Sequence, residues 1–477
     1  MTSPRIIQGG MGVGVSNWQL ARAVSALGQL GVVSGTALDQ ILARRLQDGD
    51  PGGHMRRALS RFPLPALAQE VWEAYYIPGG KPASASYKAP PMPTPDGPAN
   101  LRRLTVVANF VEVTLAREGH SNPVGINYLE KIQIPHLPSL YGAMLAGVGV
   151  VLMGAGIPTR IPGAIDRLAN HEPATYPLNV TGALADDDNL LRFDPAELSG
   201  DRPAAPLARP QFLAIVASDV LARTLQKKSN GRVDGFVVEG PTAGGHNAPP
   251  RGGGSLNSRG EPVYGERDRV DLDRMRALGL PFWLAGGYGA PARLAEAIAL
   301  GAAGVQVGTA FALCRESGLR SDLRRDLLAR VAAGQAEVVT DPRASPTGFP
   351  FKVAVLDGTL SDANAYRTRP RICDLGYLRE AYRSSDGQVA FRCPAEPVSV
   401  YVSKGGSEAD TRGRKCICNA LVANIGHGQV RAGKYHELGL VTAGDDLVNV
   451  GQFVPAGSLD YGAADVVRTL LGSPGAV

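Results

Sequence analysis

The residue best suited to a catalytic role in this sequence is His246, the last residue of the segment EGPTAGGH at 239–246. The segment follows a short apolar run, so it is predicted to leave the end of a strand. There the backbone amides of Gly244 and Gly245 can contact a ligand. The imidazole, with a pKa of about 6.5 in solution, can take up or release a proton near neutral pH. A histidine that is merely packed or exposed is the other interpretation.

Two later glycine turns have the order and spacing of a phosphate site. LAGGY at 284–288 and GVQVGTAF at 304–311 each place glycines between an apolar run and a helical pattern. Backbone N–H groups at such turns bind phosphate, and the turns after strands seven and eight are the usual phosphate grip of (β/α)₈ barrels. The alternative is a pair of ordinary strand-to-helix turns.

A further glycine cluster, QGGMG at 8–12, follows the first predicted strand. Gly10 and Gly12 would let the backbone approach a flat ligand, and Met11 could pack against its ring. Since glycine-rich strand ends are common, this segment alone is a weak indication of a site.

The elements that must position these residues are short apolar strands that alternate with helical patterns. Strands without polar alternation are typical of parallel sheets covered on both faces, and the alternation indicates an α/β fold. We predict roughly eight strands between residues 5 and 307, which favours a closed (β/α)₈ TIM barrel over an open doubly wound sheet. The predicted strands are 5–8, 31–35, 105–109, 124–127, 148–153, 212–217, 235–239, 281–285 and 304–307.

The length of 477 residues exceeds the roughly 250 that such a barrel needs. We assign residues 1–335 to the barrel and 336–477 to a C-terminal extension that contains cysteines. A large insertion after strand 2, at 37–100, carries helical pieces around 39–46 and 54–59 and is expected to lie as a lid on the loop side. A second segment, 174–209, is predicted to be irregular.

Four cysteines of the extension follow the spacing C-x₁₉-C-x₂₂-C-x-C. Reduced thiolates in this number can bind zinc or an iron–sulfur cluster, which makes the extension a possible metal or Fe-S site. The usual paired C-x₂-C knuckles are absent, so plain structural thiols are the leading alternative. The four residues are Cys373, Cys393, Cys416 and Cys418.

The motifs QGGMG, EGPTAGGH, LAGGY and GVQVGTAF, in this order, resemble those of the nitronate monooxygenase family, formerly called 2-nitropropane dioxygenases. FMN-dependent enoyl reductases belong to the same superfamily. PVGINYLE at 123–130 and MGAGIP at 153–158 are similar too, so the resemblance spans roughly residues 4–320. The insertion, the irregular segment and the extension depart from the compact members of the family.

The resemblance implies a TIM barrel with one non-covalent FMN. It places the flavin phosphate on Gly286, Gly287, Gly308 and Thr309, and makes His246 the proton-transfer residue beside the flavin. It also implies that the following residues line the isoalloxazine and ribityl parts: Gly10, Met11, Asn127, Glu239 and Gln306.

The implied activity is oxidation of an anionic nitronate or similar carbanion with O₂ by an FMN-dependent flavoprotein. An NAD(P)H-dependent enoyl reductase acting on acyl thioesters is the second hypothesis, and a non-redox barrel, an isomerase or lyase that holds a phosphorylated substrate, is a third. The cofactor would carry the redox chemistry, while the protein supplies position and proton transfer.

The overall composition indicates which classes of binding partner this protein can have. The net charge is +5, and no Lys/Arg run is dense enough for a nucleic-acid footprint. No segment approaches the roughly 20 apolar residues of a membrane helix, and the N-terminus lacks a signal-peptide pattern. We therefore expect a cytoplasmic enzyme with a small-molecule substrate and O₂ or NAD(P)H as redox partner; an oligomer is possible.

Overall fold

The computed structural model describes residues 3–200 and 205–472, and its centre is a barrel of parallel strands. Within the described residues eight strands pair in the order β1-β12-β11-β9-β8-β4-β3-β2, every pair parallel. Their bounds are β1 Ile6–Gln8, β2 Gly31–Ser34, β3 Val124–Leu129, β4 Val150–Gly154, β8 Gln211–Val216, β9 Gly235–Glu239, β11 Phe282–Ala285 and β12 Gly304–Val307.

The two ends of this strand order meet, which closes the barrel. Ile7 forms a parallel bridge with Leu30, just before β2. The Gln8 amide donates to the Leu30 carbonyl at 2.9 Å, and the Leu30 amide donates to the Ile6 carbonyl at 3.1 Å. The predicted TIM barrel is therefore confirmed, and the open doubly wound sheet is excluded.

Successive strand residues serve two separate apolar cores, as the alternation of side chains along a strand requires. Inside the barrel Ile7, Val32, Leu152 and Trp283 belong to one small cluster. Their strand neighbours, such as Ile6, Val33 and Val151, belong to the large cluster between the barrel and its helices. Both faces of each strand are thus buried, which explains the near-continuous apolar runs in the sequence.

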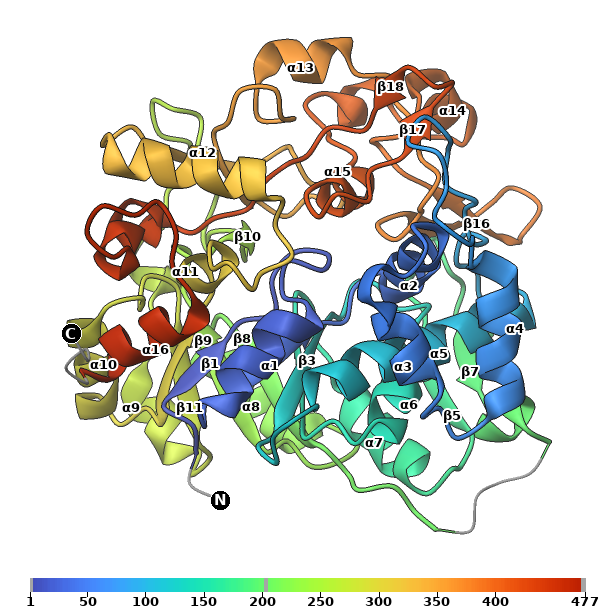
Figure 1. Ribbon diagram of the computed structural model, residues 1–477, viewed down its shortest axis with the longest axis horizontal. Helices are drawn as coiled ribbons and strands as arrows, with labels where there is room; N and C mark the ends of the chain where they lie inside the picture. The colour runs from blue at the N-terminus through green and yellow to red at the C-terminus, as the bar shows by residue number, and fades with distance from the viewer. Residues whose placement is uncertain (1–2, 201–204, 473–477) are drawn as a thin grey trace.

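A ring of helices covers the barrel (Figure 1), and its last member comes from the end of the chain. The helices that follow the strands are α1 Trp18–Ala26, α5 Ala99–Ala116, α6 His136–Leu145, α7 Ile161–Ala169, α8 Asp219–Lys228, α9 Leu272–Ala277 and α10 Pro291–Ala299. Only the four-residue α11, Thr309–Ala312, follows β12 directly. α16, Ala463–Leu471, takes the place of a long helix after β12: it packs against both α10 and α1 and is the eighth helix that covers the barrel.

One predicted strand is wrong: residues 105–109 lie in the middle of helix α5. This helix is buried on nearly all sides, with 13 of its 18 residues inaccessible. It is enclosed because α1, α2, α3, α4 and α6 all contact it. A helix buried all round has no amphipathic period, so its β-branched run TVVANFVEV has the same pattern as a buried strand.

The insertion after β2 is mainly helical. It contains α2 Leu38–Gln47, α3 His54–Leu59 and α4 Pro65–Tyr75, and the first two confirm the predicted helical pieces. The segment that follows α4 hydrogen-bonds to the C-terminal extension: the Tyr87 amide donates to Gln429 Oε1 at 2.7 Å. The insertion and the extension therefore form one continuous layer.

The segment 174–209 is less irregular than predicted. β5 Ala174–Pro177 and β7 Leu190–Phe193 pair as an antiparallel ribbon. The short β6 Val180–Thr181 adds to the extension strands β15 Glu380–Arg383 and β16 Val389–Arg392. Residues 201–204 lie outside the described residues.

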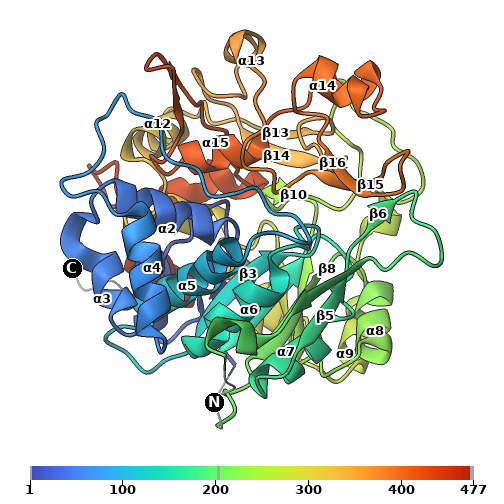
Figure 2. The ribbon, with the colours of Figure 1, turned by 90° about the vertical axis from the view of Figure 1, so that its right-hand side faces the viewer.

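The extension forms a cap over the ends of the barrel strands, as the orange layer in Figure 2 shows. Its strands β13 Val338–Asp341 and β14 Phe351–Ala354 pair with β10 Gly245–His246, which belongs to the loop after β9. Through α16 the chain then returns to the barrel wall. Residue 336 stays our proposed start of the extension, but the extension and the barrel share one apolar core.

The described helices include none with the length and apolar character needed to cross a lipid bilayer.

Candidate functional site

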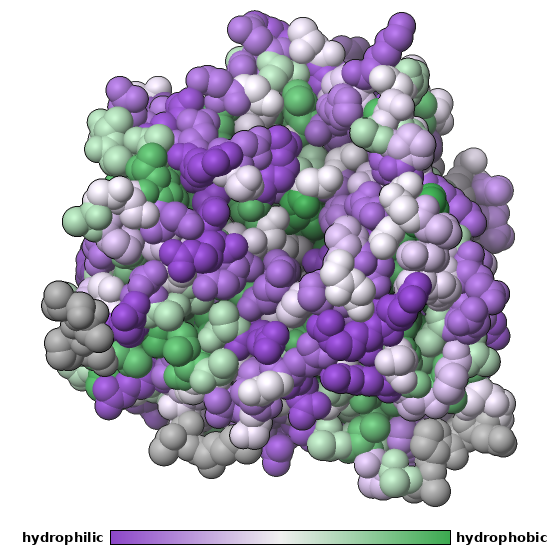
Figure 3. All heavy atoms as spheres, viewed as in Figure 1, coloured by the Kyte–Doolittle hydropathy of each residue, from purple (hydrophilic) through white to green (hydrophobic). Residues whose placement is uncertain are grey.

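The carboxyl ends of the barrel strands open into a cavity beneath the cap. The empty volume is about 1480 Å³, part of it open to solvent. Figure 3 shows a hollow with an apolar floor between the cap and the barrel on one face of the molecule. Every residue for which we predicted a cofactor or catalytic role lines this cavity: Gly10, Met11, Gly12, Asn127, Glu239, Gly244, Gly245, His246, Gly286, Gly287, Gln306, Gly308 and Thr309. The structure thus brings together residues that are up to 299 positions apart in the sequence.

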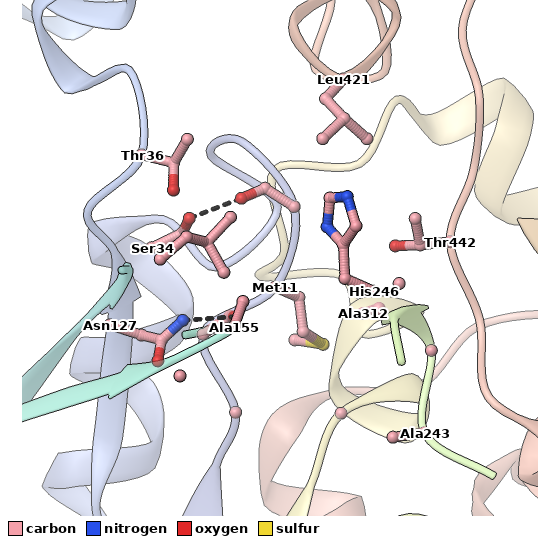
Figure 4. A pocket seen from close by; sticks show the side chains of 18 of the residues that line it. Met11, Ser34, Thr36, Asn127, Ala155, Ala243, His246, Ala312, Leu421 and Thr442 are labelled. Atoms are coloured by element: carbon pink, nitrogen blue, oxygen red, sulfur yellow. Dashed lines mark hydrogen bonds between the residues drawn. The ribbon is translucent and has the colours of Figure 1, made fainter. Parts of the chain in front are cut away.

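The first glycine turn comes very close to the third strand. A Cβ atom on Gly10 would lie 2.4 Å from Asn127 Cβ, so a larger residue cannot occupy this position without a shift. Asn127 Nδ2 donates to the Gly10 carbonyl at 3.4 Å, as the dashed line in Figure 4 marks. The turn therefore offers bare backbone to the cavity.

The turn after β11 needs glycine for a different reason. Gly286 and Gly287 have φ angles of +88° and +74°, in the left-handed region that favours glycine. A Cβ on Gly286 would also lie 2.9 Å from Thr242 Oγ1. The loop after β9 and the turn after β11 are thus in direct contact at the site.

Two side-chain acceptors in the cavity wall lack a hydrogen-bond partner among the described residues. These are Asn127 Oδ1 and Gln306 Oε1, both buried. Leaving a buried polar atom unpaired costs roughly 1–3 kcal/mol. Both oxygens can accept hydrogen bonds from the N–H or O–H groups of a bound molecule.

Glu239 ends β9 and adds a titratable group to the same wall. Burial raises the pKa of its carboxyl to about 7, because the ionised form loses solvation. At neutral pH this side chain is thus held near the midpoint between its acid and its carboxylate.

His246 is fixed by residues of the cap. In Figure 4 its ring stands between Met11 and Thr442. Its Nε2 hydrogen-bonds to Ser345 Oγ at 2.7 Å, and its ring packs against Phe351 with centroids 4.7 Å apart. The β10–β14 pairing brings both partners into place, because it sets His246 opposite Phe351.

The hydroxyl network behind His246 allows the tautomer that carries its hydrogen on Nε2. Ser345 Oγ accepts from the Thr347 amide at 3.2 Å and bonds Thr347 Oγ1 at 2.8 Å. The Ser345 hydroxyl can donate its hydrogen to Thr347 Oγ1. A lone pair on Ser345 Oγ is then free to accept a hydrogen bond from Nε2–H of His246. His246 Nδ1 is then the acceptor nitrogen. Burial, with Lys131 as a second cause, lowers the pKa of His246 well below its ordinary value, so the ring is neutral at pH 7.

A segment of the cap also covers the predicted phosphate end. The Gly444 amide donates to Thr309 Oγ1 at 2.9 Å, and the Asp445 amide donates to the Thr242 carbonyl at 2.9 Å. Asp446 lines the cavity beside them, and burial raises the pKa of its carboxyl. Residues 442–446 thus clamp the loops after β9 and β12.

The four cysteines of the extension are neighbours, but they do not all face the same space. Cys373, Cys393 and Cys416 pack together, whereas Cys418 lines the large cavity. Among the described residues no group of three or more His, Cys, Asp or Glu side chains is placed to hold a metal ion. The described residues therefore give no support to a zinc or Fe-S site.

The sequence interpretation missed the residues that the cap contributes. Ser345, Phe351, Tyr377 and Asp446 reach the site from a region with no recognisable pattern. Lys131, one residue beyond the segment PVGINYLE, was also missed. Its position after a predicted strand was the only available signal.

Comparison with known proteins agrees with the predicted motifs. Residues 207–341, which include EGPTAGGH, LAGGY and GVQVGTAF, match the nitronate monooxygenase family model. A nitronate monooxygenase of Pseudomonas aeruginosa is 32% identical over 169 residues, 34% of this chain and 46% of that protein. The chain thus spans about half the length of this relative.

Solved structures show more distant likenesses. FabK from Thermotoga maritima is 20% identical with a TM-score of 0.40, covering 77% of this chain and 74% of that one. Nitroalkane oxidase from Streptomyces ansochromogenes is 16% identical with a TM-score of 0.46, covering 98% and 95%. The barrel assignment rests on the strand pairing and not on these scores. The match over residues 207–341 confirms the resemblance for three of the four motifs: this part of the chain is similar to the nitronate monooxygenase family.

Proposed function

We propose that the protein is an FMN-dependent oxidoreductase that oxidises a nitronate or a similar carbanion with O₂. The observation that carries this proposal is the convergence of all thirteen predicted site residues on one cavity at the carboxyl ends of the strands. The matched family points to the same activity.

The cavity fits a flavin mononucleotide in three respects. The bare backbone at Gly10 leaves room for a flat ring. The unpaired oxygens of Asn127 and Gln306 can accept from polar hydrogens of the ring and the ribityl chain. The glycine turns after β11 and β12 stand where barrels of this type bind phosphate. When bound, FMN supplies the electron-accepting chemistry.

The chain's own residues supply position and proton transfer. A neutral His246 can accept a proton at Nδ1 while Nε2 stays anchored on Ser345. This suits the conversion of a neutral carbon acid into its anion. The cap covers the strand ends and so limits the contact of the site with bulk water, which strengthens the electrostatic interactions inside.

The test is an anaerobic absorbance titration of the purified protein. We expect a yellow protein whose flavin band bleaches on addition of an alkyl nitronate. Bleaching by NADH or NADPH alone would instead support an enoyl reductase. Absence of a flavin band even after adding FMN would contradict the proposal and leave a non-redox barrel.

A further inference from the structure

Lys131 carries an amino group that has no partner. Its Nζ is buried and forms no hydrogen bond within the described part of the chain. No ion pair of Lys131 is found there either, and the group stands 3.8 Å from the centroid of the Phe349 ring. An aromatic face stabilises a cation only in part. A buried ammonium without a counter-ion is costly, so this group is suited to receive an anion from outside the chain.

The adjacent acid, Glu130, acts on Lys131 only through its electrostatic field and forms no ion pair with it among the described residues. Glu130 Oε1 accepts from Gln133 Nε2 at 2.9 Å and from the Tyr176 hydroxyl at 2.8 Å. On the other side, Lys131 lies close enough to His246 to lower its pKa electrostatically. Phe349, beneath the ammonium, lines a third cavity together with His246, and the empty volume of this cavity is about 960 Å³. Lys131 is therefore placed next to the proton-transfer residue.

Lys131 also lines a second chamber that adjoins the proposed flavin cavity. The empty volume of this chamber is about 1510 Å³, part of it open to solvent. Both spaces are lined by Ile132, Ala155, Tyr377 and Leu378. The chamber's other walls include apolar and aromatic side chains of the cap and of segment 174–209: Leu178, Phe349, Phe391 and Tyr401.

The other charged groups on the chamber wall already have partners. Arg379 and Arg414 donate to backbone carbonyls. Glu380 pairs with Arg392 at 2.9 Å, and Asp410 accepts from the Ser407 amide at 3.3 Å. The two arginines keep their charge, but backbone carbonyls hold their N–H groups, whereas Lys131 Nζ forms no hydrogen bond within the described residues.

We propose that the chamber is the substrate site, that Lys131 Nζ binds the oxyanion of the substrate, and that the apolar walls hold a body larger than a small alkyl group. The inference rests on the proposed function, and it specifies the substrate class as an anionic head on an apolar or aromatic body. Lys131 binds the head beside His246, and the body extends under the cap.

Calorimetric titration with non-reacting probes tests this inference on the protein as purified. The probes are 4-phenylbutyrate, its neutral amide 4-phenylbutyramide, and acetate. We expect 4-phenylbutyrate to bind at least tenfold more tightly than either of the other two. In Lys131→Met the affinity for 4-phenylbutyrate should fall at least tenfold, while that for the amide changes less than twofold. Lys131→Arg should restore binding of the anion.

The exposed Lys434 supplies the matched control, because Lys434→Met removes the same charge far from any described cavity wall. Equal affinity of wild type and a folded Lys131→Met variant for 4-phenylbutyrate would overturn the role of Lys131. Equal affinity of wild type for acetate and 4-phenylbutyrate would overturn the role of the chamber. Neither outcome depends on turnover, so failure of the redox proposal, seen as a missing flavin band, is read separately.

Discussion

At the scale of single residues, the site combines a neutral imidazole and two unpaired amide oxygens in one cavity with an unpaired ammonium in the adjoining chamber. None of these features follows from residue type alone. Each depends on burial and on which partner a side chain lacks. The functional predictions at this scale therefore concern His246, Ser345 and Lys131.

Replacing His246 by alanine should remove the proton acceptor but leave the flavin in place. With a neutral nitroalkane as the substrate, we expect kcat to fall by about 10²- to 10⁴-fold, the usual contribution of general acid–base catalysis. Steady-state kinetics and the flavin absorbance of the same preparation provide the measurement. Full turnover in the variant would remove His246 from the mechanism.

Ser345 is a positioning residue, and its loss should act through His246. Ser345→Ala removes the hydrogen bond to Nε2, which is worth about 0.5–1.5 kcal/mol, so kcat should fall by roughly three- to tenfold. The pH profile of kcat/KM should shift as well, because the imidazole loses its anchor. Ser345→Thr keeps a hydroxyl and should recover most of the activity; an unchanged profile in Ser345→Ala would argue against the anchoring role.

Anion binding by Lys131 should weaken as the pH rises. Burial lowers the pKa of its ammonium to about 7, with Glu130 opposing the shift. The other charged or titratable groups around the chamber are His246, Arg379, Arg414, Glu380 and Asp410. Because the charged form is present below this pKa and lost above it, 4-phenylbutyrate should bind well at pH 6 and at least several-fold more weakly at pH 8. In Lys131→Arg this pH dependence should disappear. An equal Kd of the wild type for 4-phenylbutyrate at pH 6 and pH 8 would refute the role of Lys131 as the anion-binding group.

At the scale of elements, the strand ends of the barrel were predictable and the cap was not. The strands β1, β2, β9, β11 and β12 have clear apolar runs followed by glycine, so their site residues could be inferred from the sequence. Helix α5 was mistaken in part for a strand because burial on all sides removes its period. The cap residues approach the site through β10–β14 pairing, a long-range contact that no local pattern encodes.

The turn after β1 gives a prediction at this scale. Gly10→Ala places a Cβ 2.4 Å from Asn127 Cβ, so the turn or Asn127 must shift. We expect a stability loss of about 1–3 kcal/mol, typical of overpacking, together with weaker FMN retention. Gly254→Ala is the control, since a Cβ there meets nothing within 4 Å. Urea unfolding and flavin content report the two effects, and identical values for both variants would show that the close approach at Gly10 is unimportant.

At the scale of the whole molecule, the barrel depends on the far end of the chain. Leu470 of α16 is 2% exposed and lies in the main apolar core. Leu470→Ala should lower the free energy of unfolding by about 2–5 kcal/mol, as for other buried leucines. Leu459, 48% exposed, serves as the control, and Leu459→Ala should change stability by less than about 0.5 kcal/mol. Chemical denaturation measures both; a stable Leu470→Ala variant would mean that α16 is dispensable.

The position of α16 between α1 and α10 also bears on how the protein is made. Domains generally fold during synthesis from the N-terminus onward. Here α1 packs against α16, which is translated much later. The nascent ring must therefore stay open until α16 has been made. We expect chaperones to bind a nearly complete barrel whose ring of helices still has a gap between α1 and α10.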